Sequence, residues 1–179
     1  MRCLGHVVLL ISIALASSAS VRAEDAAVTR LAYTTTYEDA FGRAYHGLYT
    51  INLDGRDARL LSVQPLGIAG IDWRPDGTVA YVDSWNDRLS VWTVSPVSLD
   101  LDWFTTSNLW DDSYPSWSPD GTRFAMMSNR AGNDDVYIVN AAALDADRVE
   151  YAAEHDPISI THTPADERWP AWSPMGDAI

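Results

Sequence analysis

The chain has 179 residues, a length that suggests one domain or two. It carries 25 acidic residues against 12 basic ones, so its formal net charge is -13 and it offers no basic patch to neutralise the phosphates of a nucleic acid. Its single cysteine, Cys3, excludes a disulfide within the chain and a cysteine-based zinc site. The composition therefore indicates an acidic globular protein, rich in tryptophan and tyrosine, that does not bind nucleic acid.

The first 23 residues have the three parts of a secretory signal peptide. Arg2 gives a positive start, residues 7–15 (VVLLISIAL) are apolar, and small residues lead to Val21-Arg22-Ala23. An uncleaved anchor helix is the alternative, but the apolar stretch is shorter than the roughly 20 residues of a membrane span. We expect cleavage after Ala23, no stable membrane span afterwards, and a periplasmic or secreted bacterial protein.

The rest of the chain repeats. Three segments share the pattern Trp-x-Pro-x-Gly, and their tryptophans lie 44 and 55 residues apart. Proline presets the backbone for a turn and glycine accepts a left-handed conformation, so each segment predicts a turn between two strands. The residues that define the repeat are Trp73, Pro75, Gly77, Trp117, Pro119, Asp120, Gly121, Trp172, Pro174 and Gly176.

Short apolar stretches with period-two alternation predict strands around these turns. They cover residues 31–34, 48–53, 79–82, 89–94, 124–127, 135–139 and 177–179, whereas 140–144 is interpreted as part of a loop insertion. A period of 40–50 residues with four short strands per unit is typical of β-propeller blades. The predicted fold class is all-β, with blades of four-stranded antiparallel meanders in units that start near residues 30, 68, 112 and 167. We expect the tryptophans to pack between blades.

About three blades are present, whereas closed propellers usually have four to eight. The ring is therefore incomplete in this chain. We expect the sequence to be an N-terminal fragment of a longer protein; the alternative is that two copies join into one ring as an oligomer.

The second repeat carries a specific resemblance. Residues 115–125 (PSWSPDGTRFA), followed by 128–130 and 135–139, resemble the repeat of TolB-like β-propellers. Residues 160–174 are similar to the stretch between blades in the same family. The resemblance covers residues 30–179 and implies the propeller fold, with 24–179 as a partial TolB-like propeller after the signal peptide.

The resemblance has exceptions. The first repeat has Ile71 where proline is usual and Arg74 where serine is usual, and the third has Met175 in place of aspartate. Such repeats also occur in the non-catalytic propeller of prolyl-oligopeptidase-type enzymes. The resemblance therefore implies a fold more narrowly than a function.

No motif for catalysis is present: the sequence lacks a Gly-x-Ser-x-Gly elbow, a His-Glu-x-x-His pair and a glycine-rich phosphate loop. His155 and His162, near Asp156, Asp166 and Glu167, suggest either a metal site or solvated loop histidines, and we favour the second interpretation. Two further pairs match only fragments of a calcium loop: Asp100 with Asp102, and Asp145 with Asp147. We predict no cofactor and no metal.

Two acidic pairs are the candidate functional residues. Each pair precedes a Pro-x-Trp strand, which would be innermost in a blade, and an aromatic residue follows each pair at the same offset. A ring of carboxylates with aromatic residues could bind a cationic or polar peptide, whereas the alternative is that the acids cap turns. The candidate rim consists of Asp111, Asp112, Tyr114, Asp166, Glu167 and Trp169.

These features predict an exported, non-enzymatic propeller module that binds a protein or peptide. The alternative is the N-terminal, non-catalytic propeller of an exported prolyl-oligopeptidase-type peptidase, whose hydrolase domain is missing from the chain. A sugar-binding or metal-binding propeller is a third hypothesis.

Overall fold

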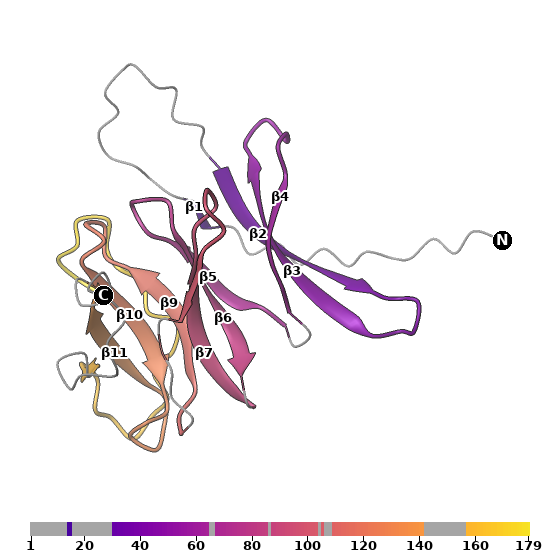
Figure 1. The fold of residues 1–179 in the computed structure, drawn as a ribbon. Coiled ribbons are helices and arrows are strands. Elements are labelled where there is room, and N and C mark those ends of the chain that lie inside the picture. Colours follow the sequence, from indigo (N-terminus) through magenta and orange to yellow (C-terminus); the bar gives the residue numbers. More distant parts are fainter. Residues whose placement is uncertain are drawn as a thin grey trace, which may run out of the picture. The chain divides into compact units, whose positions relative to one another are not determined.

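The computed structural model describes residues 14–15, 30–64, 67–85, 87–103, 105, 109–141 and 157–179. In this part of the chain the strands form three four-stranded sheets, each with antiparallel neighbours (Figure 1). The chain divides into two compact units, Met1–Ile68 and Ala69–Ile179. The predicted fold class, four-stranded antiparallel blades in an incomplete ring, is confirmed.

The first unit holds one sheet, with the strand order β1-β2-β3-β4. Its strands are β1 (Ala14–Leu15), β2 (Arg30–Glu38), β3 (Ala44–Asn52) and β4 (Arg59–Gln64). β2 and β3 pair over nine residues, from Arg30 opposite Asn52 to Glu38 opposite Ala44. β1 belongs to the predicted signal peptide and pairs with β2; the rest of that peptide, with its cleavage site, lies outside the described residues.

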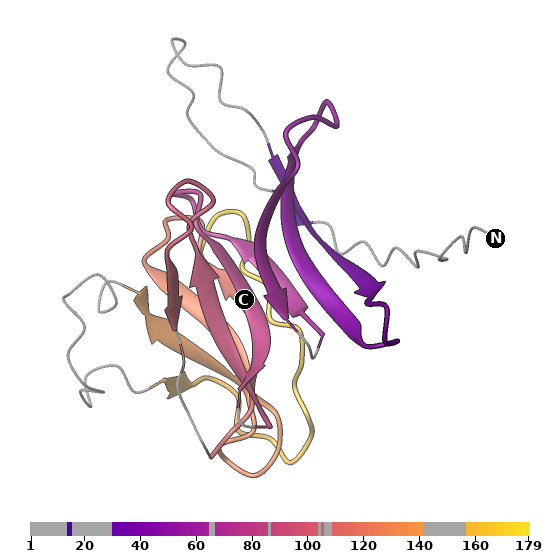
Figure 2. The same cartoon turned by 45° about the vertical axis from the view of Figure 1, so that its right-hand side comes forward.

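The second unit holds the other two sheets (Figure 2). The first of these is the meander β5 (Ala69–Trp73), β6 (Val79–Trp85), β7 (Arg88–Val94) and β8 (Leu101–Trp103). The next is the meander β9 (Asp112–Trp117), β10 (Arg123–Ser128), β11 (Asp135–Asn140) and β12 (Ile158–Ser159). Each meander begins with the strand that ends at a repeat tryptophan, so the repeat pattern marks the first turn of each sheet.

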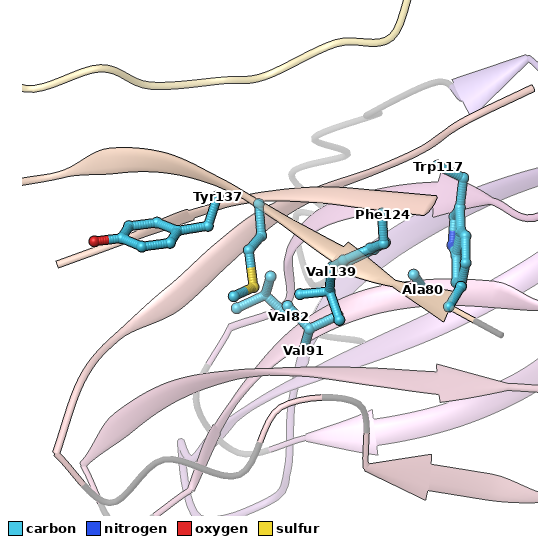
Figure 3. Close-up of a cluster of buried hydrophobic side chains, with 9 residues drawn as sticks. Ala80, Val82, Val91, Trp117, Phe124, Tyr137 and Val139 are labelled. Carbon is cyan, nitrogen blue, oxygen red and sulfur yellow. The ribbon is translucent and has the colours of Figure 1, made fainter. Parts of the chain in front are cut away.

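A hydrophobic core fills the space between these two sheets (Figure 3). Trp117 is only 5% exposed, and its ring meets Phe124 edge-on with 5.0 Å between the ring centroids. The prediction that repeat tryptophans pack between blades is therefore confirmed for Trp117. The buried residues of this core are Ala80, Val82 and Val91 from one sheet, and Trp117, Phe124, Met126, Tyr137, Val139 and Ala141 from the other.

Two expectations are wrong. Residues 177–179 are not a strand: the Ser173 N–H donates to the Ala178 carbonyl and closes the turn, but within the described residues 177–179 belong to no sheet. Trp169 is 67% exposed and lies outside the core, whereas the tryptophans were expected to pack between blades.

Across the part of the chain that the structure describes, there is no helix able to cross a membrane.

Candidate functional site

Tyr114 and Trp169 occupy equivalent positions, three residues before a repeat tryptophan, and their rings are in contact. The centroids lie 5.8 Å apart and the ring planes meet at 80°, an edge-on arrangement typical of aromatic pairs. Tyr114 is half-buried, whereas Trp169 is exposed. The structure thus brings together the two aromatic residues of the candidate rim.

Both residues have a left-handed backbone, which is unusual for a bulky side chain. The φ angles are 51° for Tyr114 and 56° for Trp169, and the corresponding residue of the first repeat, Gly70, has a φ of 65°. Such a conformation costs an aromatic residue on the order of 1–3 kcal/mol. The three repeats therefore share one backbone geometry, with glycine in the first and an aromatic residue in the other two.

A β-bulge accompanies this geometry in both complete meanders. The register shifts at Gly70 between β5 and β6, and at Tyr114-Pro115 between β9 and β10. A Cβ atom on Gly70 would lie 2.9 Å from Pro115 Cδ and 3.2 Å from Tyr114 Cα, so the first repeat has no room for a side chain there. Bulges commonly redirect a side chain out of the regular pleat. The bulge between β9 and β10 contains Tyr114, whose side chain is not part of the core cluster.

Asp111 fastens the segment before β9 to the preceding sheet. Its carboxylate accepts hydrogen bonds from the Leu89 backbone N–H (3.0 Å) and from Asn129 Nδ2 (2.9 Å), and it pairs with Arg88 at 3.1 Å. The Asp111 backbone N–H in turn donates to Asn129 Oδ1 at 2.8 Å. Asp111 thus connects the β6–β7 hairpin to the β10–β11 hairpin.

Asp112 is buried, with 1% of its surface exposed. Its carboxylate pairs with Arg130 at 2.9 Å, and Arg130 also bonds Ser128 Oγ and lies over the Tyr137 ring. A buried carboxylate is stable only when it is paired in this way. The structure thus places Asp112 inside the β9–β11 sheet and not on its surface.

Asp166 and Glu167 bind the β10–β11 turn. Asp166 accepts a hydrogen bond from the Asp134 backbone N–H (3.3 Å) and pairs with Arg168 at 3.0 Å. The Glu167 backbone N–H donates to the Asp134 carbonyl, and Thr163 Oγ1 donates to the Glu167 carboxylate, which lowers the pKa of that carboxyl. All four acids of the candidate rim therefore make contacts within their own or a neighbouring blade.

Each repeat donates one backbone hydrogen bond to a side chain of the preceding repeat, and the sequence pattern did not predict these two bonds. The Trp117 backbone N–H donates to Asp72 Oδ2 at 2.6 Å, and the Trp172 backbone N–H donates to Ser116 Oγ at 3.2 Å. Asp72 and Ser116 each precede a repeat tryptophan, and that position is the signal that could have identified them. Burial raises the pKa of Asp72 to about 6, although hydrogen bonds from the backbone of Trp117 and Trp73 oppose the shift.

The repeat turns are also in contact with one another. A Cβ atom on Gly121 would lie 3.2 Å from Pro75 Cδ, and one on Gly176 would lie 3.5 Å from Pro119 Cδ. Both glycines have a positive φ, as the turn prediction requires. Each proline thus packs against the glycine of the next repeat.

The turn of the first repeat is shorter than that of the second, because Trp73 pairs with Val79, six residues on, whereas Trp117 pairs with Phe124, seven residues on. Arg74 N–H bonds the Thr78 carbonyl, whereas Ser118 N–H bonds the Arg123 carbonyl, which makes the second turn one residue longer. Ser118 Oγ also accepts a bond from the Arg123 backbone N–H at 2.9 Å, a contact that arginine cannot make. Arg74 instead lies over the Trp117 ring, 5.0 Å from its centroid.

The remaining candidates give no metal site within the described residues, where no three metal-ligating side chains form a group. His162 Nδ1 lies 3.0 Å from Ser159 Oγ, and Asp100 and Asp102 are exposed in and after the β7–β8 turn. The other residues of those predictions, His155, Asp156, Asp145 and Asp147, lie outside the described residues.

Comparison with known proteins identifies similar sequences and folds. The TolB homolog of Chlorobium luteolum is 37% identical over 114 residues, which are 63% of this chain and 24% of that protein. The chain thus spans about a quarter of this curated relative. No family model matches the chain.

Solved structures agree with this relation. A TolB from Agrobacterium tumefaciens matches 83% of this chain and 48% of its own, with a TM-score of 0.63 and 21% identity. TolB from Acinetobacter baumannii matches 82% of this chain and 33% of its own, with a TM-score of 0.60 and 14% identity. The resemblance of the chain to TolB-like β-propellers is therefore confirmed.

Proposed function

We propose that this chain is part of an exported, non-enzymatic β-propeller module that binds a protein or peptide segment through Tyr114 and Trp169. The signal peptide would comprise residues 1–23 and the partial propeller 24–179, with units that start near residues 30, 68, 112 and 167. The similarity to TolB proteins supports a binding module over a catalytic one.

The observation that carries the proposal is the exposed ring of Trp169 against Tyr114. An indole that is 67% exposed adds little to the core, yet its backbone adopts a costly left-handed conformation. Tryptophan and tyrosine are enriched at the centres of protein interfaces because they contribute a large contact area with few rotatable bonds. Two aromatic rings kept at the surface, despite a backbone conformation that lowers the free energy of unfolding, fit a binding role.

The carboxylates support the rings instead of contacting the ligand directly. Asp111 and Asp166 hold the segments that precede Tyr114 and Trp169, while Asp112 pairs with Arg130 and the Glu167 backbone N–H donates to the Asp134 carbonyl. We expect a partner with a polar or cationic segment, since the chain has a net charge of -13.

A phage-displayed peptide library selected on the protein tests this function. We expect enriched peptides whose affinity, measured by calorimetry, falls at least tenfold in Trp169→Ala and in Tyr114→Ala. Val97→Ala is a control, because Val97 is 89% exposed and belongs neither to the candidate rim nor to the β2–β3 hairpin. Peptides that bind all variants equally, or no enrichment at all, would overturn the proposal.

N-terminal sequencing of the exported protein tests the signal peptide, with Glu24 expected as the first residue.

A second candidate function is the propeller of an exported peptidase. A puromycin-hydrolyzing peptidase of Mycobacterium tuberculosis matches 65% of this chain and 19% of its own length, with a TM-score of 0.51. Sequencing of the gene beyond codon 179 separates the two functions. Two or three further Trp-x-Pro-Asp-Gly repeats followed by a stop codon support the binding module, whereas a Gly-x-Ser-x-Gly element in a strand-turn-helix context supports the peptidase.

A further inference from the structure

We propose that the tip of the β2–β3 hairpin is a second interaction site, which places Phe41 in an apolar pocket of a partner protein. We call residues 37–45 the docking hairpin. The site shares no residue with the candidate rim, and no part of the proposed function depends on it.

The docking hairpin extends past the strand that supports the rest of β3. β4 pairs with β3 only as far as His46, which lies opposite Gln64, whereas β2 and β3 remain paired out to Glu38 and Ala44 (Figure 1). The last residues of these strands therefore form a two-stranded ribbon. Such a ribbon is marginally stable in water unless side chains reinforce it.

Side chains of the docking hairpin supply that reinforcement. The Asp39 carboxylate accepts hydrogen bonds from the backbone N–H groups of Phe41 (2.8 Å) and Arg43 (3.0 Å), and from Arg43 Nε (2.7 Å). Behind the turn, Tyr37 and Tyr45 stack with their ring centroids 5.7 Å apart. These contacts hold the turn in one shape.

The ordered turn presents an exposed aromatic ring. Phe41 is 84% exposed, so its burial contributes almost nothing to the stability of the fold, and Arg43 lies over the ring with Cζ 5.4 Å from the centroid. A fixed, exposed aromatic residue loses little conformational freedom on binding and is well suited to anchor an interface. By contrast, the tip of the β10–β11 hairpin, residues 130–133, carries no aromatic side chain.

The charge of Arg43 indicates which group should lie at the edge of the partner's pocket. The Arg43 side chain is 65% exposed, and its contact with Asp39 uses Nε, so the terminal guanidinium nitrogens remain available among the described residues. A guanidinium with free terminal nitrogens matches a carboxylate. A single carboxylate can meet the guanidinium alone, whereas the extended negative charge of an anionic bilayer would also face Glu38 and Asp39 beside the turn. The partner should therefore carry an apolar pocket with a carboxylate at its edge.

Photo-crosslinking in the cells that export the protein tests the proposal. A benzophenone amino acid at position 41 should give one discrete protein adduct. The same probe at Leu53, which is exposed in the next hairpin turn, should not give that adduct. The crosslinked protein is then identified by mass spectrometry, purified and titrated.

In that titration, we expect Phe41→Ala to weaken binding at least tenfold and Arg43→Gln to weaken it several-fold, while Leu53→Ala leaves it unchanged. The melting temperature of Phe41→Ala should equal that of the wild type, which separates lost contact from lost folding. The titration with Phe41→Ala is separate from the selected-peptide measurement with Trp169→Ala, so failure of the docking hairpin and failure of the candidate rim are distinguishable. The proposal is overturned if position 41 gives no adduct, only a lipid adduct or the adducts seen at position 53, or if Phe41→Ala binds like the wild type.

Discussion

The backbone N–H of Trp117 donates a hydrogen bond to the carboxylate of Asp72, with 2.6 Å between the nitrogen and Oδ2. The bond joins the first strand of one blade to the first strand of the next. Ser116 and Trp172 repeat the arrangement with a hydroxyl acceptor. The hydrogen bond therefore recurs between successive repeats, and only in the first case is its acceptor an ionisable carboxylate, that of Asp72.

Asp72 should make the protein more stable in mild acid. Burial raises its folded-state pKa to about 6, above the ordinary value of 3.8, so the folded state binds more protons than the unfolded state between these pH values. The contribution of Asp72 should thus be most favourable near pH 4 and be lost as the pH rises through 6, by on the order of 2 kcal/mol. Chemical denaturation at pH 4, 5, 6 and 7 measures the effect.

Asp72→Asn is the matching control, because an amide oxygen can still accept the Trp117 N–H but cannot ionise. The variant should lose most of the pH dependence between pH 4 and 7. Asp83 contributes in the same direction, because burial also raises its pKa. An identical pH profile in the wild type and in Asp72→Asn would show that Asp72 does not titrate in this range.

Gly121→Ala should destabilise the protein more than Gly77→Ala. Both glycines have a positive φ, which costs an alanine about 1 kcal/mol. Only at Gly121 does the new Cβ also meet a neighbour, Pro75 Cδ at 3.2 Å, whereas nothing lies within 4 Å at Gly77. The free energies of unfolding of the two variants are compared. Equal losses would show that the contact between Gly121 and Pro75 does not limit the space at position 121.

Trp117→Ala and Trp169→Ala should separate the core tryptophan from the surface tryptophan. Trp117 is buried against Phe124, so its removal should cost about 3–5 kcal/mol. Trp169 is mostly exposed, and its removal should change the free energy of unfolding by about 0.5 kcal/mol or less. Similar losses for the two variants, measured by thermal unfolding, would mean that one burial is misassigned.

Asp112→Asn should cost more than Asp166→Asn. The first substitution removes the charge that pairs with Arg130 inside the sheet, for about 2 kcal/mol. The second weakens an exposed pair with Arg168, which should contribute less than about 1 kcal/mol. Denaturant titration of both variants measures the difference, and a smaller loss for Asp112→Asn would argue that its ion pair is solvated.

Local chemistry made part of this structure predictable. Proline and glycine at fixed offsets imply a turn, and period-two alternation implies strands, so the turns at Gly77 and Gly121 and the burial of Trp117 followed from the sequence. The turns depend on residues that are close in the chain, and the repeat of the tryptophan indicated its burial. The TolB-like resemblance extended them to the fold.

The candidate site was less accessible to sequence reasoning, because it depends on register. Asp112 meets Arg130 only because β9 and β10 pair with Asp112 opposite Ser128. The exposed Trp169 has a left-handed backbone, a conformation that the sequence predicts for glycine but not for tryptophan. Asp72 was missed because its hydrogen-bond partner lies 45 residues away.

A double-mutant cycle on peptide binding tests whether Tyr114 and Trp169 form one binding surface. The Kd of a selected peptide is measured by calorimetry for the wild type, Tyr114→Ala, Trp169→Ala and the double variant. If the two rings form one binding surface, each single variant should weaken binding at least tenfold, and the two effects should be non-additive by about 0.5 kcal/mol or more. Unchanged affinity in both single variants, with both proteins folded, would contradict the claim that this surface binds the partner.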